Sequence, residues 1–280
     1  MTSSPTIAFV GGGNMAWALA LGMADRICSP NQIHIVEINR DTRARWQAQG
    51  MHVYDAPGPH LALADIVVLS VKPQNMREVV NSIRPYLTED TLVVSIAAGI
   101  RSDTLAAWLG TPQTPWLKLV RCMPNTPALV GAGASGLAAL AGVTAQDRDR
   151  VTKIFESVGA VIWVADDAAI DAVTALSGSG PAYVFLFIES LIAGGIAQGL
   201  DAAQARALAL ATLRGATQLA AESNEPPEKL RHNVTSPGGT TAAALAVFEA
   251  ANLRGVVGDA MAAAAERSRS LAAEAAKGAD

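Results

Sequence analysis

The chain has 280 residues, of which 50% are apolar, 16% charged and 5% aromatic. This length allows one large domain or two modest ones, and the scarcity of aromatic side chains predicts an interior packed mainly from Ala, Val, Leu and Ile. A formal charge of −4, without any basic stripe, argues against a nucleic-acid partner. Because no basic segment precedes an apolar stretch at the start, we expect no secretory signal and a cytoplasmic location.

The cysteines and the most apolar segment each have a simple structural interpretation. Cys28 and Cys122 lie far apart without a C-x-x-C or histidine pairing, so we expect two buried thiols, no disulfide framework and no metal site. The window 181–200 is long enough to cross a bilayer, but Glu189, Gln198 and several glycines interrupt it. We therefore predict a helix buried in a core or a subunit interface, and no membrane partner.

The first 163 residues alternate short β-branched runs with Ala- and Leu-rich helical patterns, which is typical of a parallel sheet covered by helices. The β-branched runs are almost entirely apolar, which fits strands that are buried on both faces of the sheet. The predicted strands are Ile7–Val10, Ile33–Ile38, Ile66–Ser70, Leu92–Ile96, Leu117–Val120, Ser135–Ala138 and Val161–Val164.

After about Val164 the pattern becomes helical, so we predict an α/β domain at residues 1–163 and an all-helical domain at residues 164–280. The segment 272–280 reads as a frayed tail. The helices expected at Pro181–Gly199, Ala202–Glu222 and Arg254–Ala276 are apolar over most of their circumference. One small bundle cannot hide that surface, so a homodimer through these helices is expected.

A glycine-rich turn follows the first predicted strand and opens an Ala- and Leu-rich helix. Its pattern is G-x-G-x-x-A: Gly11 would make the tight turn, Gly13 would let the backbone approach a pyrophosphate, and Ala16 would permit close helix packing. The helix N-terminus would supply N–H groups to the phosphates. The pattern predicts a Rossmann-type dinucleotide-binding domain, with contacts from Gly11, Gly13, Asn14, Met15 and Ala16.

The choice between NADP and NAD depends on residues after the second predicted strand. Glu37 could accept hydrogen bonds from a ribose 2′-hydroxyl, which would favour NAD. Arg40, with Asn39 beside it, could instead bind a 2′-phosphate, or it could be a solvated residue at the start of the next helix.

Three further segments follow predicted strands and should meet at the carboxyl edge of the sheet, where ligands bind. We expect them to line the cofactor. For Asn125, a role as a simple turn residue is the alternative. The residues are Val71, Lys72 and Pro73; Ala97, Ala98 and Gly99; and Met123, Pro124 and Asn125.

Two polar, glycine-rich segments, Ser177–Pro181 and Thr235–Thr241, each precede a predicted helix. In the second, glycines before a helix N-terminus would expose several N–H donors beside three hydroxyls, which predicts a carboxylate receptor. Capping of a helix at Thr241–Ala250 is the alternative, although a cap needs only one hydroxyl.

The helical domain has few strong proton donors: its lysines are Lys229 and Lys277, and its histidine is His232. Ketone reduction would require such a donor for the developing alkoxide. An imine can arrive protonated or take a proton from a hydroxyl and water, so the hydroxyl cluster favours an imine substrate.

These motifs resemble those of pyrroline-5-carboxylate reductases nearly end to end. A further run, from Pro227 through Leu230, Val234 and Leu245 to Glu249, looks like that family's signature. The blocks that occur in the family's order are Gly11–Ala16, Val71–Pro73, Ser95–Gly99, Arg121–Pro127, Ser177–Tyr183 and Thr235–Thr241.

The resemblance implies an oxidoreductase that transfers hydride from NAD(P)H to 1-pyrroline-5-carboxylate, giving L-proline in the last step of proline biosynthesis. NADPH is the favoured cofactor and NADH is an alternative. The resemblance also implies homodimers of interlocked helical domains, in some cases assembled into larger rings. Two departures affect cofactor preference: Glu37 does not suit strict NADPH use, and Asp55–His60 carries two prolines where relatives often place a ribose-binding Asn.

The resemblance also assigns roles in the helical domain. Thr241 would hydrogen-bond the ring nitrogen and assist protonation, and Asn233 would approach the cofactor. The substrate would be bound by Ser236, Gly238, Gly239, Thr240 and Ser177.

Two other functions remain open. A relative of the β-hydroxyacid dehydrogenases would share the architecture, but that family relies on a helical-domain lysine, and the helix after Ser177–Pro181 has none here. A redox sensor that binds NAD(P) without turnover would bind the cofactor but would not oxidise NAD(P)H when the imine is supplied.

Overall fold

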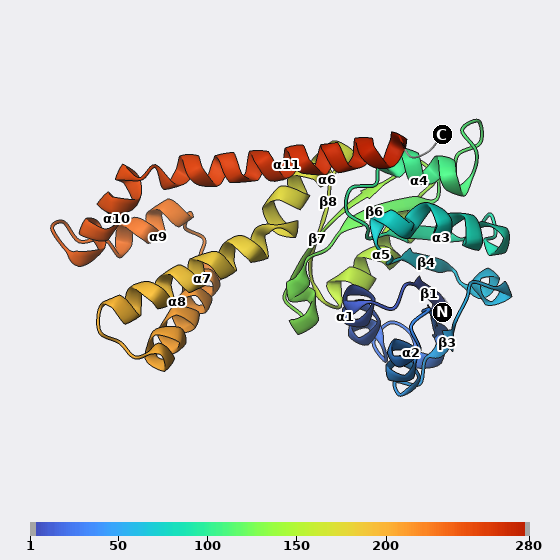
Figure 1. The fold of residues 1–280 in the computed structure, drawn as a ribbon, viewed down its shortest axis with the longest axis horizontal. Coiled ribbons are helices and arrows are strands. Elements are labelled where there is room, and N and C mark those ends of the chain that lie inside the picture. The colour runs from blue at the N-terminus through green and yellow to red at the C-terminus, as the bar shows by residue number, and fades with distance from the viewer. Residues whose placement is uncertain (1–3, 278–280) are drawn as a thin grey trace. The chain divides into compact units, whose positions relative to one another are not determined.

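The structure is a computed structural model, and it describes residues 4–277 (Figure 1). Its contacts group the chain into two compact units: a sheet unit, residues 4–179 with 264–277, and a helical unit, residues 180–263. The predicted domains divide the chain at a different place, after residue 163. The difference arises because the helix at Asp167–Val173 and the end of the last helix pack with the sheet.

The sheet unit contains an eight-stranded sheet in the order β3-β2-β1-β4-β5-β6-β7-β8. Neighbouring strands are parallel except β6 and β7, so the predicted α/β class with a Rossmann-type sheet is confirmed. The strands are β1 (Ile7–Val10), β2 (Ile33–Val36), β3 (His52–Tyr54), β4 (Ile66–Leu69), β5 (Leu92–Ser95), β6 (Leu119–Met123), β7 (Gly133–Ala139) and β8 (Gly159–Trp163).

Two features of the sheet differ from the sequence-based expectation. The strand β3 was not predicted, because it is three residues long and only partly buried. The strand β7 runs antiparallel to β6, so the sheet is parallel, as expected, except at this one pair among the described strands. Only residues 124–132 join the two strands, which is too short for the crossover that a parallel pair requires.

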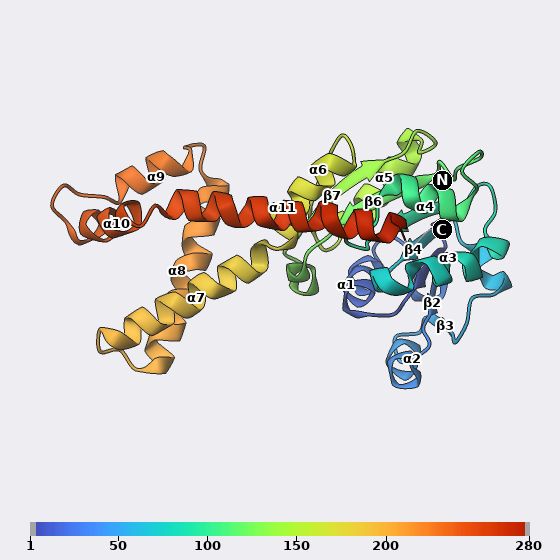
Figure 2. The same ribbon diagram turned by 45° about the horizontal axis from the view of Figure 1, so that its top comes forward.

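Helices cover both faces of the sheet, so it has two hydrophobic cores (Figure 2). One core receives side chains from α1 (Asn14–Met23), α2 (Arg40–Gln47) and α5 (Ala145–Glu156). The other receives them from α3 (Met76–Ile83) and α4 (Ser102–Leu109). The helix α6 (Asp167–Val173) contacts β6 and β7 and continues as a π-helical turn at Thr174–Gly178. Short 3-10 turns lie at Pro30–Gln32, Pro59–Leu63, Pro73–Asn75, Arg84–Tyr86 and Thr126–Val130.

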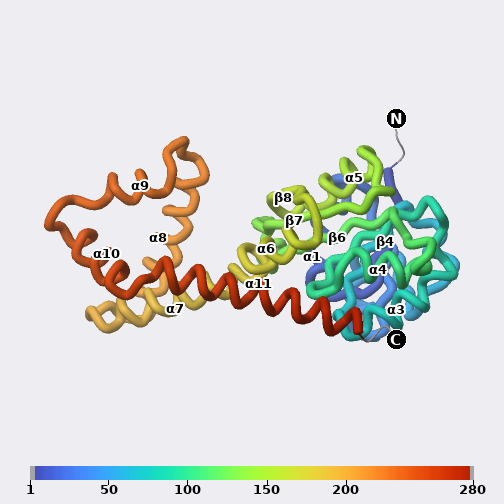
Figure 3. Tube along the Cα trace, turned by 90° about the horizontal axis from the view of Figure 1, so that it is seen from above, coloured from blue at the N-terminus to red at the C-terminus, as the bar shows by residue number. Residues whose placement is uncertain are grey.

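The helical unit contains α7 (Gly180–Ala197), α8 (Ala202–Glu222), α9 (Pro227–Asn233), α10 (Thr240–Ala250) and the start of α11 (Leu253–Lys277). The helices α7 and α8 pack side by side, and the chain then passes through α9 and α10 to α11 (Figure 3). Few of its side chains are buried, and large apolar ones stay exposed: Leu186 is 65% exposed and Val247 is 69% exposed. The surplus of apolar surface expected from the sequence is therefore present.

The last helix, α11, matches the helix predicted at Arg254–Ala276 to within one residue at each end, and it includes part of the segment expected to be a tail. Residues 272–277, expected to be frayed, are helical, and Ala272 is buried. Residues 278–280 of that expected tail lie outside the described residues. In residues 4–277 one helical stretch, 167–197, is long and apolar enough by length and composition to cross a membrane.

Candidate functional site

The glycine turn between β1 and α1 has the geometry of a phosphate-binding loop. Gly11 has φ +99°, and a Cβ there would lie 2.7 Å from the Ser70 carbonyl oxygen, so the turn requires glycine. A Cβ on Gly13 would meet nothing within 4 Å, which leaves open space beside the backbone. Ala16 is fully buried against the sheet. The turn thus supports close approach of a ligand to the start of α1.

The N-terminus of α1 keeps its backbone donors available. Gly13 is the N-cap and offers no side-chain cap, and no acidic side chain lies in the first turn, which begins with Asn14 and Met15. Unpaired N–H groups at a helix N-terminus attract anions. The residues present therefore fit a dinucleotide pyrophosphate at this point.

Two side chains from the β2–α2 region hydrogen-bond to the backbone of the glycine turn. The Glu37 carboxylate accepts a hydrogen bond from Gly12 N at 2.8 Å through Oε2. Trp46 Nε1 donates to the Gly12 carbonyl oxygen at 3.0 Å, and the Trp46 side chain is completely buried. Both polar groups of the Gly12 backbone are thus bound by side chains, which fixes the conformation of the turn.

Glu37 already uses both carboxylate oxygens, because its Oε1 accepts from Asn39 N at 2.8 Å. Its two oxygens are thus oriented by backbone N–H groups, and each keeps a further lone pair that can accept a hydrogen bond. Asn39 is the N-cap of α2, and its side chain accepts from Thr42 N at 3.0 Å. Arg40, the first residue of α2, is exposed beside it.

The other predicted cofactor segments lie where expected, after three parallel strands. The segment Val71–Pro73 follows β4, Ala97–Gly99 follows β5, and Met123–Asn125 ends β6 and leads into the next turn. Because β1, β4, β5 and β6 are parallel, these segments and the glycine turn share the carboxyl edge of the sheet. The site includes the point where β1 lies between β2 and β4, where doubly wound sheets bind ligands.

The side chain of Asn125 makes structural contacts. Its Oδ1 accepts from Ala134 N at 2.8 Å, and its Nδ2 donates to the Ser177 carbonyl oxygen at 3.0 Å. The hydroxyl of Ser177 in turn donates to the Val173 carbonyl oxygen at 3.1 Å within the π-helical turn. Both side chains stabilise the turn that precedes α7.

A buried ionic network below this edge was missed by the sequence analysis. Arg121 on β6 is 1% exposed, and its guanidinium lies 2.6 Å from Asp167 Oδ1 and 3.7 Å from Asp171 Oδ1. Asp167 also accepts from the backbone and hydroxyl of Ser102, and Asp171 accepts from Ser268 Oγ at 2.7 Å. We call these five residues the Arg121 network. An arginine inside an otherwise apolar strand was the available signal, because a buried charge requires partners.

The remaining predicted residues lie in the helical unit, at the start of α10. Gly238 has φ +70° and Gly239 is the N-cap, so Thr240 and Thr241 occupy the first two helical positions. Within residues 4–277 the hydroxyls of Ser236, Thr240 and Thr241 make no hydrogen bond. Glycines, helix N–H groups and free hydroxyls together form a site that suits a carboxylate.

Asn233 is the last residue of α9, and its amide donates to Glu225 Oε2 at 2.9 Å. Its approach to the cofactor stays a prediction, as do the assigned roles of the other site residues.

Both cysteines are free and buried. Burial, with Asp25 nearby, raises the pKa of Cys28 to about 11, and burial raises the pKa of Cys122 well above its usual value. Neither thiol is therefore activated as a nucleophile near neutral pH. In the part of the chain that the structure describes, no group of three or more His, Cys, Asp or Glu residues is arranged to hold a metal ion.

Comparison with known families assigns both halves of the chain. Residues 167–271 match the family described as pyrroline-5-carboxylate reductase dimerisation. Residues 6–99 match the family described as NADP oxidoreductase, coenzyme F420-dependent. The pyrroline-5-carboxylate reductase of Pseudomonas aeruginosa is 44% identical over 271 residues, covering 96% of this chain and 98% of that protein.

Solved structures agree with the sequence relatives. A pyrroline-5-carboxylate reductase from Coxiella burnetii superposes with a TM-score of 0.89 at 37% identity, over 96% of this chain and 99% of that one. The Plasmodium falciparum pyrroline carboxylate reductase, solved with NADP bound, superposes with a TM-score of 0.84 at 33% identity, over 96% and 98% of the two chains. The chain belongs to the pyrroline-5-carboxylate reductase family.

Proposed function

We propose that this protein reduces 1-pyrroline-5-carboxylate to L-proline with NAD(P)H, the last step of proline biosynthesis. The observation that carries the proposal is the match over 96% of the chain to a reductase of that name, at 44% identity. The glycine turn and the polar start of α10 supply the two binding functions that such a reaction needs. When bound, the nicotinamide supplies the hydride that adds to the imine carbon.

The proposed cofactor site is the carboxyl edge of the sheet. The start of α1 would bind the pyrophosphate, and the segments after β4, β5 and β6 would line the nicotinamide half. We favour NADPH over NADH, because the family matched at residues 6–99 is described as an NADP oxidoreductase and Arg40 is exposed at the start of α2. An exposed guanidinium there can pair with a 2′-phosphate.

The proposed substrate site is the N-terminus of α10. The N–H groups of Gly239, Thr240 and Thr241, with the hydroxyls of Ser236 and Thr240, would bind the carboxylate. The Thr241 hydroxyl would hydrogen-bond the ring nitrogen and assist its protonation, so that no lysine or histidine is required. A role for Ser177 would involve its backbone, because its hydroxyl is bonded within the π-helical turn.

We further propose that the working enzyme is a homodimer formed through the helical unit, which can assemble into a larger ring. The match of residues 167–271 to the family's dimerisation region and the exposed apolar side chains of α7, α8 and α10 support association. A cytoplasmic location is proposed because both cysteines are free thiols, which suits a reducing compartment.

The direct test is an assay of absorbance at the reduced-nicotinamide band, with 1-pyrroline-5-carboxylate and each cofactor in turn. We expect oxidation that depends on the imine, proline as the product, and a higher kcat/KM with NADPH than with NADH. Cofactor binding without oxidation would contradict the proposal and favour a redox sensor.

A further inference from the structure

The last two turns of α11 present one face to the rest of the sheet unit. Ser268, Leu271, Ala272 and Ala275 recur at intervals of three and four residues, which places them on one side of a helix. Ser268 and Ala272 are each 4% exposed, and Ala275 packs against the core that α3 and α4 form with the sheet. We call these four residues the brace.

The Arg121 network anchors the first residue of the brace. The hydroxyl of Ser268 donates to Asp171 Oδ1 at 2.7 Å, and both side chains are buried. The same network reaches Ser102, the first residue of α4, which follows Gly99 by three positions. A buried hydrogen bond to a carboxylate is stronger than one between neutral groups, so α11 is fixed at this point.

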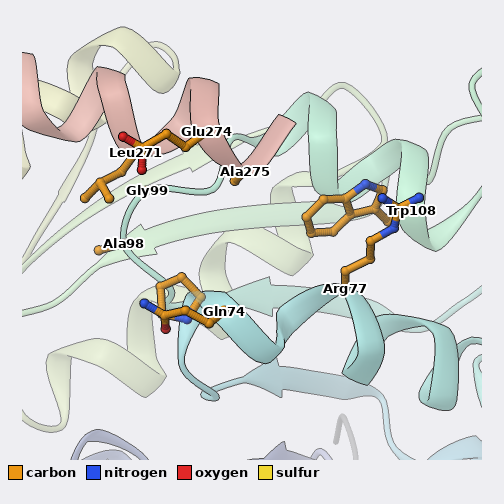
Figure 4. A pocket seen from close by; sticks show the side chains of 9 residues that line it. Gln74, Arg77, Ala98, Gly99, Trp108, Leu271, Glu274 and Ala275 are labelled. Carbon is orange, nitrogen blue, oxygen red and sulfur yellow. The ribbon is translucent and has the colours of Figure 1, made fainter. Parts of the chain in front are cut away.

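The next residue of the brace touches the loop after β5. Gly99 has φ +71°, and a Cβ placed there would lie 2.8 Å from Leu271 Cβ, so the helix and the loop are in close contact. Figure 4 shows Leu271 and Ala275 facing this loop, with Gln74 on its other side. These residues border a cavity of about 430 Å³. The helix α11 therefore contacts the loop directly at Gly99.

We propose that the brace is a positioning element for the cofactor: it holds the Ala97–Gly99 loop in the conformation that binds the dinucleotide. The inference rests on the proposed function, which places this loop beside the nicotinamide half. A loop held by few contacts samples many conformations, and ordering it on binding costs free energy. The contact of Leu271 and the anchor at Ser268 reduce that cost before the cofactor arrives.

The test compares variants of the full-length protein that change one brace contact each. Ser268→Ala removes the donor to Asp171, and Leu271→Ala removes the side chain beyond Cβ, including Cδ1, which lies 3.6 Å from the position of a Cβ on Gly99. Ser270→Ala is the matched control, because it lies on the same helix but off the brace face. Ser268→Thr restores a hydroxyl and should rescue the first variant.

Two readouts report on the loop without relying on turnover: hydrogen exchange of a peptide spanning residues 95–101, and the Kd for NADPH by calorimetry. We expect both brace variants to exchange faster in this peptide and to raise the Kd by about fivefold. Ser270→Ala and Ser268→Thr should match the wild type.

Wild-type exchange and wild-type Kd in both brace variants would overturn the inference, even if their unfolding stability fell, because the helix would then be merely structural. Failure of the wild type to oxidise NADPH with the imine would reject the proposed reaction. The brace would still be judged by exchange and dinucleotide binding.

Discussion

The Thr241 hydroxyl lies at the second position of α10, and within residues 4–277 it makes no hydrogen bond. Thr241→Val keeps the shape of the side chain and removes this hydroxyl. We expect kcat to fall about 100-fold, the lower end for loss of general acid catalysis. KM for the imine should change little, because in the proposed site the carboxylate is bound mainly by backbone N–H groups.

Thr235→Val is the control for this substitution. Its hydroxyl donates to the Arg231 carbonyl oxygen at 2.6 Å and has no proposed chemical role. Steady-state kinetics should show near wild-type kcat for this variant. Full turnover in Thr241→Val would remove Thr241 from the mechanism.

We expect a second group of residues, the histidines near β2 and β3, to make stability depend on pH. His34, on β2, lies 5.2 Å from His52 between ring centroids, and His60 stacks on Tyr54 at 3.5 Å. Burial, together with His52 and His60, lowers the pKa of His34, and burial lowers the pKa of His60. Within the described residues, Nδ1 of His34 and Nε2 of His60 are buried without a hydrogen-bond partner.

Lowering the pH through about 6.5, the usual histidine value, should therefore reduce the free energy of unfolding, because the unfolded chain binds protons that the native side chains resist. Urea unfolding at pH 7 and at about pH 5 measures this loss. We expect His34→Gln to show a smaller loss than the wild type. The exposed control His232→Gln should keep the wild-type loss, and an unchanged loss in His34→Gln would contradict the assignment.

At the scale of elements, the glycine turn depends on α2 as well as on β1 and α1. Trp46→Phe removes the hydrogen bond to the Gly12 carbonyl oxygen and keeps most of the packing. The loss of about 1 kcal/mol typical for one hydrogen bond should raise the Kd for NADPH about fivefold.

Trp163→Phe is the matched control. The indole nitrogen of Trp163 donates to Thr152 Oγ1 at 2.9 Å. Trp163 lies on β8, at the opposite edge of the sheet from β3. Calorimetric titration of both variants measures the difference. If the Kd for NADPH of Trp46→Phe equals that of Trp163→Phe, the Trp46 hydrogen bond does not shape the turn.

The Arg121 network should matter far more for stability than any exposed ion pair. Arg121→Ala leaves the buried carboxylates of Asp167 and Asp171 without their cation, which typically costs about 3–5 kcal/mol. Arg254→Ala breaks the exposed pair with Glu249 and should cost less than about 1 kcal/mol. Chemical unfolding of the two variants gives the comparison, and similar costs would contradict the role assigned to the network.

Most of the sheet could be predicted from the sequence, because its buried strands are apolar runs of at least four residues, as in Ile7–Val10. The strand His52–Tyr54 could not, because three partly exposed polar and aromatic residues give no periodic signal. Residues 272–277 read as a tail because alanines alone do not reveal a packing partner. Within this segment, Ala275 packs against the core beneath α3 and α4, which is distant in sequence.

The location of the candidate site was also predictable, since the glycine spacing and the strand ends mark one edge of the sheet. The hydrogen bonds that individual side chains make at that edge were less predictable. Glu37 binds Gly12, 25 positions away, and Asn125 binds Ser177, 52 positions away. Such pairings follow from tertiary packing, which no local pattern reports.

At the scale of the whole molecule, the apolar side chains of the helical unit should be covered by another copy of the chain. Leu186→Glu places a charge at a position on α7 that is 65% exposed in the single chain. If α7 lies in the dimer interface, burial of that charge should shift the assembly towards a 28.9 kDa monomer.

Leu63→Glu is the control, since Leu63 is 69% exposed but lies in the sheet unit. Light scattering during size-exclusion chromatography measures the mass of each variant. An unchanged mass for Leu186→Glu, together with an unchanged mass for the control, would exclude α7 from the interface.

The most direct test of the whole account is a crystal structure of the assembled protein with NADPH and L-proline. We predict the dinucleotide pyrophosphate at the start of α1 and the proline carboxylate on the N–H groups of Gly239–Thr241 from one of the protomers. The proline ring should lie against the nicotinamide. A structure in which Gly238–Thr241 of every protomer lies far from the nicotinamide ring would contradict the account.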